Sequence, residues 1–167
     1  MKKLITCSLL VMAFLFCNNN LNAQAYNNGI GLRLGWGYGL TFKHFVNEKA
    51  AIEGILNYRS YGITGYSYNY LRITGLYLVH SPIASVEGLQ WYFGGGAMFQ
   101  SWGGDFDKYL PSEKTTNIGI VGALGLDYKF AGVPISITAD WLPTFIIGGY
   151  GNGFASEAGG LAIRYTF

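Results

Sequence analysis

The last eight residues of the chain, Gly160-Leu161-Ala162-Ile163-Arg164-Tyr165-Thr166-Phe167, alternate between large apolar and small or polar side chains. Successive side chains of a β-strand point to opposite faces. One face of such a strand therefore carries Leu161, Ile163, Tyr165 and Phe167. The other face carries Arg164 between two smaller residues. The stretch predicts a β-strand with one apolar face.

The same alternation recurs through most of the chain, most clearly over 29–36, 118–130 and 135–145. It predicts eight strands, at 29–37, 39–46, 50–61, 68–81, 89–102, 115–131, 133–147 and 156–167. Short turns at 47–49, 82–88 and 131–132 alternate with looser connections at 62–67, 102–114 and 148–155. We therefore expect one all-β domain, an eight-stranded antiparallel up-and-down β-barrel that spans a membrane.

The N-terminal segment follows a different pattern. Lys2 and Lys3 precede an apolar run over 4–16, and small residues follow at Ala23 and Ala25. This order is typical of a cleaved secretory signal peptide. Cleavage after Ala23 and cleavage after Ala25 fit the pattern equally. We predict a signal peptide at 1–23 and the barrel domain at 24–167.

Composition and charge exclude several classes of protein. Of the 167 residues, 50% are hydrophobic, only 12% are charged, and 25 are glycines. An ordinary soluble domain has about 25% charged residues, so the second face of these strands is too poor in charge for a water-facing shell. Removal of the signal peptide takes away Cys7, Cys17 and two lysines, which leaves equal numbers of basic and acidic residues. We expect neither thiol chemistry nor attraction of nucleic acid by bulk charge.

The charges that remain fall on the polar faces of the predicted strands. If the apolar faces contact lipid, these charges point into a narrow lumen. Unpaired buried charge is costly, so we predict an internal network of ion pairs. Its expected members are Arg33, Lys43, Glu53, Arg59, Arg72, Asp127, Asp140 and Arg164, with Asp140 as a candidate partner of Arg164. Eight strands leave a lumen that side chains fill, which disfavours a diffusion pore.

The signal peptide, the alternating chain and the terminal Leu161-x-Ile163-x-Tyr165-x-Phe167 pattern resemble small eight-stranded bacterial outer-membrane barrels of the OmpA/OmpX type. The resemblance covers all of 24–167. In that family the terminal pattern is the signal that the barrel assembly machinery reads. The resemblance implies an integral outer-membrane protein in contact with lipid. It implies no particular function, because such barrels serve unrelated functions.

Aromatic residues near the predicted strand ends suggest two girdles at the membrane interfaces. The periplasmic girdle would contain Phe45, Trp91, Tyr128, Phe130 and Phe167. The outer girdle would contain Trp36, Tyr58, Tyr61, Tyr70, Trp102 and Phe145. Two features interrupt the pattern. Pro143 predicts a bulge or a strand end, and 73–79 has apolar residues on both faces, which leaves its register open.

Few residues suggest chemistry. His44 and His80 lack the spacing of a metal site, so we expect them to have packing roles. His80, Ser81 and Glu87 are the residue types of a lipid-modifying barrel enzyme, but neighbours on a strand point to opposite faces. The longest loop contains three carboxylates, those of Asp105, Asp107 and Glu113. A calcium site usually has six to eight oxygen ligands, so we expect no calcium site here.

We therefore expect a non-enzymatic, monomeric outer-membrane barrel without cofactor or metal, which stabilises the envelope or presents loops to a surface partner. The alternative is an outer-membrane acyl hydrolase or transferase that uses His80, Ser81 and Glu87. An enzyme acting on outer-leaflet lipid needs its polar cluster near the outer interface. The predicted strands place His80 at the opposite interface, which favours the first interpretation.

Overall fold

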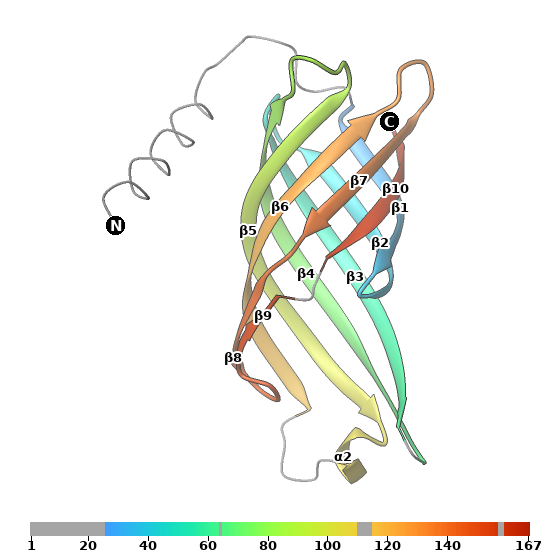
Figure 1. The fold of residues 1–167 in the computed structure, drawn as a ribbon, viewed down its shortest axis with the longest axis vertical. Helices are drawn as coiled ribbons and strands as arrows, with labels where there is room; N and C mark the ends of the chain where they lie inside the picture. Colours follow the sequence, from blue (N-terminus) through green and yellow to red (C-terminus); the bar gives the residue numbers. More distant parts are fainter. Residues whose placement is uncertain (1–25, 64, 110–114, 157–158) are drawn as a thin grey trace, which may run out of the picture.

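The wall of the molecule is one antiparallel sheet that closes on itself (Figure 1). The computed structural model describes residues 26–63, 65–109, 115–156 and 159–167. The predicted signal peptide at 1–23 lies outside these residues. We call the end with the C-terminus and the turns at 46–49, 83–88 and 130–134 the turn end, and the opposite end the loop end. Within the described residues, no helix has the length and apolar character needed to cross a bilayer.

Ten strand segments of the described residues make up the eight strands of the barrel. They are β1 (Asn28–Gly35), β2 (Gly37–Phe45), β3 (Ala50–Ile63), β4 (Tyr66–Pro82), β5 (Leu89–Gly104), β6 (Thr116–Lys129), β7 (Ile135–Trp141), β8 (Thr144–Gly148), β9 (Gly153–Ala155) and β10 (Gly159–Thr166). β1 pairs with both β2 and β10, which closes the sheet. β7 and β8 both pair with β6 and form the seventh strand, while β9 and β10 belong to the eighth. The predicted eight-stranded antiparallel barrel is confirmed.

The seventh strand is interrupted at Leu142 and Pro143. Proline has no N–H to donate to a strand ladder. The strand predicted at 133–147 is therefore divided at Pro143, where a bulge or a strand end was predicted. The Gly122 N–H donates to the Pro143 carbonyl oxygen at 2.8 Å. β6 therefore bridges the interruption and keeps both segments in the wall.

The strands at the loop end are longer than predicted. Residues 62–67 were expected to form a loop, but β3 and β4 continue to the pair Ile63 and Tyr66. The chain reverses there at Gly65, whose φ of 89° is a left-handed conformation that glycine adopts without strain. β5 continues to Gly104, and the short helix α2 (Phe106–Tyr109) follows it. Paired strands thus replace much of the loop structure expected at this end.

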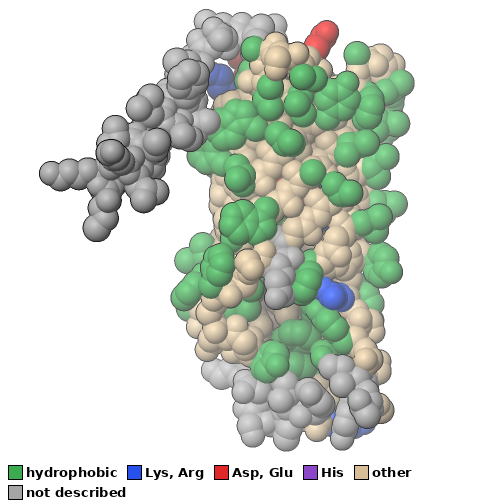
Figure 2. Space-filling model, in the orientation of Figure 1, with side chains coloured by type: hydrophobic (Ala, Val, Ile, Leu, Met, Phe, Trp, Pro, Cys, Tyr) green, Lys and Arg blue, Asp and Glu red, His purple; other side chains and the backbone are tan. Residues whose placement is uncertain are grey.

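The outer surface of the wall is apolar and the inner surface is polar. Five residues from the apolar faces of the predicted strands are all exposed: Leu32 (60%), Ile120 (59%), Leu124 (50%), Ile137 (39%) and Ile163 (51%). The side chains of Arg33 and Asp140, predicted to face inward, are 4% and 2% exposed. Figure 2 shows hydrophobic side chains spread over the outer surface of the wall. The alternation read from the sequence therefore describes both faces correctly.

The segment 73–79 contributes apolar side chains to both faces. In β4, Ile73 and Tyr77 point outward, whereas Leu76 and Leu78 are buried inside the barrel. They join an apolar layer across the lumen that consists of Ile55, Leu76, Leu78, Tyr92, Met98, Val121, Ala123 and Leu142. The lumen is thus packed by side chains.

The wall is higher on one side than on the other. β1, β2 and β10 have 8, 9 and 8 residues, whereas β3 to β6 have 14, 17, 16 and 14. β2 pairs with β3 only as far as Tyr58, and β9 pairs with β8 alone among the described residues. Within the part of the chain that the structure describes, the sheet therefore has no ladder between residues 59–63 of β3 and β9. We call this stretch the wall gap.

Candidate functional site

The candidate site is the group of charged side chains that fills the lumen. Arg164 of β10 donates from Nη2 to Glu53 Oε1 of β3, and from Nη1 to Thr138 Oγ1 at 3.0 Å. The Thr41 hydroxyl donates to the same Glu53 oxygen at 2.7 Å. The side chains of Arg164 and Glu53 are 0% and 1% exposed. Since an uncompensated buried charge costs several kcal/mol, each of these two groups depends on the other.

Lys43 of β2 connects this pair to a second carboxylate. Its Nζ lies 3.0 Å from Asp127 Oδ2 and 3.4 Å from Glu53 Oε2. The Tyr26 hydroxyl, from the segment before β1, donates to Asp127 Oδ2 at 2.8 Å. His80 Nε2 of β4 lies 3.4 Å from Lys43 Nζ. Side chains from β2, β3, β4, β6 and β10 are thereby joined inside the barrel.

Arg33 and Asp140 form a further ion pair between β1 and β7. Arg33 Nη1 donates to Asp140 Oδ2 at 2.8 Å, and Nη2 donates to Oδ1. A guanidinium that makes two parallel hydrogen bonds to a carboxylate is held in one geometry. The Tyr92 hydroxyl of β5 donates to Asp140 Oδ2 at 2.8 Å, and Lys43 Nζ lies 4.5 Å from the Tyr92 ring centroid. Tyr92 therefore contacts the Arg33–Asp140 pair through its hydroxyl and Lys43, from the other group of ion pairs, through its ring.

Gly125 makes room for the contact between Tyr92 and Asp140. A Cβ at Gly125 would lie 2.6 Å from Tyr92 Cζ and 2.7 Å from Asp140 Cβ. Overpacking a filled interior costs about 1–3 kcal/mol, and we expect Gly125→Ala to destabilise the barrel by this amount. The melting temperature, measured by heat-modifiable migration on gels, would report the loss. Gly54→Ala is the matched control, because no atom lies within 4 Å of its added Cβ; equal losses for the two variants would contradict the prediction.

Two of the eight residues predicted for the network lie outside it. The Arg59 guanidinium lies 4.0 Å from the ring centroid of Trp36 and 4.5 Å from that of Tyr61. Arg72 Nη2 donates to Thr144 Oγ1 at 2.7 Å. Neither arginine forms an ion pair with a carboxylate of the described residues. Arg59 therefore stacks on aromatic rings, and Arg72 binds a hydroxyl.

The partner predicted for Arg164 is also different. In the pairing of β10 with β7, Arg164 lies opposite Ser136, whereas Asp140 lies opposite Gly160. Four residues separate the two levels, about 13 Å along a strand at about 3.3 Å per residue. Arg33, which lies opposite Ala162, is closer to Asp140. Register along the strands therefore decides the pairing.

Four aromatic residues predicted for the girdles point inward instead. Tyr61 lies on the inward face of β3 with Glu53, and Trp102 lies on the inward face of β5 with Gln100. Phe45 and Tyr70 are only 5% and 2% exposed. Phe45 shares the inward face of β2 with Lys43, and Tyr70 shares the inward face of β4 with Arg72. At the loop end, aromatic rings pack on one another around Trp102, whose neighbours are Tyr61, Tyr68, Tyr70, Phe106 and Tyr150.

The three residues of the alternative enzyme site are not brought together by any hydrogen bond among the described residues. His80 is buried in the lumen. Ser81 follows it on β4, and its side chain is directed to the other side of the strand. Glu87 is exposed in the turn at 83–88. His44 Nδ1 lies 2.8 Å from Asn28 Oδ1 at the turn end.

The carboxylate of Asp105 accepts hydrogen bonds from its own loop and from β4. Oδ1 accepts a hydrogen bond from Lys108 Nζ at 2.8 Å, and Oδ2 accepts one from the Ser67 N–H at 3.2 Å. The hydrogen bond from Lys108, together with that from Ser67, lowers the pKa of Asp105. Glu113 lies outside the described residues, and the structure does not describe the side chain of Asp107.

The terminal pattern lies on the outside of the last strand. Its four apolar side chains are exposed: Leu161 (59%), Ile163 (51%), Tyr165 (56%) and Phe167 (59%). The backbone N–H of Phe167 donates to the Asn28 carbonyl oxygen at 2.9 Å, and the Asn28 N–H donates back to Phe167 at 2.8 Å. The final residue therefore closes the barrel against the first strand.

No protein-family model and no curated protein matches the sequence. Among solved structures, the chain is similar to Neisserial surface protein A, with a TM-score of 0.56 and 12% identity over 84% of this chain and 93% of that one. It is also similar to the N-terminal β-barrel domain of Pseudomonas aeruginosa OprF, with a TM-score of 0.53 and 17% identity over 86% and 100%. A match to the attachment invasion locus protein of Yersinia pestis, over 82% of this chain and 88% of that one, has 10% identity and a TM-score of 0.39. The chain has the fold of the small eight-stranded outer-membrane barrels that its sequence resembles.

Proposed function

We propose that this chain is a non-enzymatic, monomeric integral protein of the bacterial outer membrane. In this proposal it strengthens the envelope or presents its loop end to a partner at the cell surface. The observation that carries the proposal is the inverted distribution of polarity. Buried ion pairs occupy the interior, and large apolar side chains cover the exterior.

The exposed apolar side chains occur on every strand of the wall. Examples from strands around the barrel are Leu32, Leu40, Ile52, Ile73, Phe93, Ile120, Ile137 and Ile163. Exposing apolar surface to water costs about 25 cal/mol per Å², and soluble monomers rarely expose contiguous apolar patches larger than a few hundred Å². Lipid around the barrel removes this cost, which supports a membrane location.

Fractionation of cells that produce the full chain tests the location. We expect heat-modifiable protein in the outer-membrane fraction. A protease site inserted beside Asp105 at the loop end should be cut in intact cells. The same site inserted beside Glu87 at the turn end should be cut only after the membrane is permeabilised. Recovery of the protein in the soluble periplasmic fraction would contradict the proposal.

The filled lumen predicts that the barrel does not conduct. Lys43, Glu53 and Arg164 are each at most 1% exposed, and the apolar layer crosses the same interior. An ion would have to displace paired charges to pass, at a cost of several kcal/mol. We therefore expect no steady single-channel steps from the refolded protein in planar bilayers. Large, steady steps would show that the lumen is open.

A further inference from the structure

A hollow of about 320 Å³ lies at the turn end of the barrel, between the turn at 130–134 and the end of β10. The Lys129 ammonium is held at one side of the hollow, because it donates to the carbonyl oxygens of Phe130 at 2.8 Å and Val133 at 2.6 Å. The lining consists of Tyr26, Lys129, Gly132, Val133, Pro134, Thr166 and Phe167. Val133, Pro134 and Phe167 are exposed, so the hollow is open to solvent.

Tyr26 lies between this hollow and the charged lumen. Its ring packs edge-on against Phe45, with 5.1 Å between the ring centroids. Its hydroxyl donates to Asp127 Oδ2, the oxygen that also lies 3.0 Å from Lys43 Nζ. The backbone is fixed one residue later, because the Phe45 N–H donates to the Asn27 carbonyl oxygen at 2.9 Å. Rotation of the Tyr26 side chain therefore changes the cover over Asp127 without disturbing a strand.

Three polar groups behind Tyr26 have unused hydrogen-bonding capacity. Among the described residues, Asp127 Oδ1, Ser136 Oγ and Thr166 Oγ1 are buried and have no hydrogen-bond partner. They lie at the turn ends of β6, β7 and β10, and β7 pairs with both of the other strands. A buried polar group without a partner is unfavourable. Water that passed Tyr26 would satisfy these groups, so their hydration opposes the closed position of the ring.

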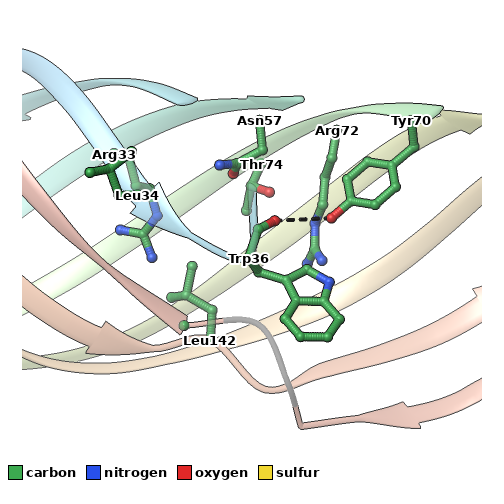
Figure 3. A pocket seen from close by; sticks show the side chains of 9 residues that line it. Arg33, Leu34, Trp36, Asn57, Tyr70, Arg72, Thr74 and Leu142 are labelled. Carbon is green, nitrogen blue, oxygen red and sulfur yellow. Dashed lines mark hydrogen bonds between the residues drawn. The ribbon is translucent and has the colours of Figure 1, made fainter. Parts of the chain in front are cut away.

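Toward the loop end, the described part of the lumen is tightly packed. Val121 and Leu78 of the apolar layer are both 0% exposed. Next to this layer, on the loop-end side, a cavity of about 20 Å³ is lined by Arg33, Trp36 and Tyr70 among others. Figure 3 shows the Tyr70 hydroxyl directed to the Trp36 carbonyl oxygen, to which it donates at 3.1 Å. A cavity of this size holds about one water molecule. The wide approach to Asp127 is therefore the hollow at the turn end.

We propose that Tyr26 is a strap that closes the turn end of the lumen and opens to admit water to Asp127, Ser136 and Thr166. In the closed state, the Tyr26 hydroxyl holds the Asp127 carboxylate and its ring rests on Phe45. In the open state, water replaces that hydroxyl on the carboxylate. The apolar layer is then a fixed seal of the lumen, and Tyr26 is a movable one. The proposal depends on the barrel alone, so it can be tested in detergent micelles whatever the location of the protein in the cell.

The reaction rate of an introduced thiol tests the proposal. Cys7 and Cys17, the two cysteines of the full chain, are replaced by alanine. Ser136→Cys then places a single thiol behind Tyr26, at a side chain that is 0% exposed. The full chain is produced in cells, and the folded barrel is purified in neutral detergent and treated with a charged methanethiosulfonate. Ser85→Cys, in the exposed turn at 83–88, gives the rate for an open thiol. With Tyr26 intact, we expect Ser136→Cys to react at least a hundredfold more slowly.

Variants of Tyr26 should accelerate the reaction at Ser136→Cys. Tyr26→Phe removes the hydrogen bond to the Asp127 carboxylate and should raise the rate at least tenfold, the factor expected for a hydrogen bond to a charged group. Tyr26→Ala also removes the ring contact with Phe45 and should raise the rate further. Tyr38→Phe is the matched control, because Tyr38 is 74% exposed on the outer surface. It should leave the rate unchanged.

Val121→Cys separates opening of the strap from general loosening of the barrel. Val121 lies in the apolar layer, six residues from Asp127 along β6, or about 20 Å. Its thiol should react equally slowly with and without Tyr26. The proposal is overturned if Ser136→Cys reacts as fast as Ser85→Cys with Tyr26 intact. It is also overturned if the folded Tyr26 variants leave the rate at Ser136→Cys unchanged, or accelerate Val121→Cys equally. If Tyr26→Ala does not fold, Tyr26→Phe decides.

Discussion

Arg164→Ala is expected to insert into membranes but to destabilise the folded barrel by about 3–5 kcal/mol, the cost of breaking a buried ion pair on one side. The substitution leaves Glu53 buried with Lys43 as its remaining cation at 3.4 Å. It also removes the hydrogen bonds that Arg164 donates to Thr138 and Thr41. The temperature at which heat-modifiable migration is lost measures the effect. An unchanged melting temperature would show that Glu53 does not depend on Arg164.

Two comparisons separate charge pairing from general packing. Arg59→Ala removes an arginine that stacks on Trp36 and Tyr61, and it should cost about 2 kcal/mol or less. The double variant Arg164→Met with Glu53→Met replaces the pair by apolar side chains. Such replacements are often neutral, so the double variant should be more stable than Arg164→Ala. A double variant that is less stable than Arg164→Ala would point to packing as the main role of Arg164.

Deletion of Phe167 should have its effect before the barrel is folded. The Phe167 ring is exposed on the outer surface beside Tyr165, with 6.1 Å between the ring centroids. The ring lies on the opposite face from the lumen charges, so the deletion should lower the melting temperature of inserted barrels only through the loss of the two backbone hydrogen bonds to Asn28, about 0.5–1.5 kcal/mol each. If the terminal pattern is the assembly signal that the family resemblance implies, the deletion should reduce the amount of inserted protein several-fold. Quantification of the folded band in membrane fractions measures this amount.

Phe167→Tyr and Phe154→Ala serve as controls for the deletion. The first retains a terminal aromatic ring. The second removes an exposed ring elsewhere, at a residue that is 67% exposed. Both variants should insert at the parental level. Normal insertion of the deletion variant would refute an assembly role for the terminal pattern.

The faces of the strands could be predicted from the sequence, because side-chain direction has a period of two residues. This rule places Leu32 outside and Arg33 inside without knowledge of the neighbouring strands. The same rule, applied to Phe45 and Tyr70, would have placed both side chains inside the barrel. Each lies two residues from an inward basic side chain, Lys43 or Arg72, which could have indicated the lumen rather than a girdle.

The ion-pair partners could not be predicted in the same way. Pairing depends on the register between strands and on reach across the lumen, and neither is encoded in the alternation of one segment. Arg164 and Glu53 belong to strands that are not neighbours in the sheet. Gly125, which admits Tyr92 to Asp140, had no sequence signal that distinguished it from other strand glycines. Sequence patterns thus identified most of the charged residues of the site but not their geometry.

The unequal height of the wall has a consequence for the lipid around it. A tilted strand needs about 9–11 residues to cross a bilayer. β1 and β10, with 8 residues each, fall short of this length, and β2, with 9, only just reaches it. On the opposite side, β4 and β5 exceed it with 17 and 16 residues. Hydrophobic mismatch costs a fraction of a kcal/mol per Å and is relieved by local thinning. Acyl chains beside the Gly35-Trp36-Gly37 turn must therefore shorten or tilt, so that the barrel sits in an asymmetric, thinned annulus and favours short-chain lipids on one flank.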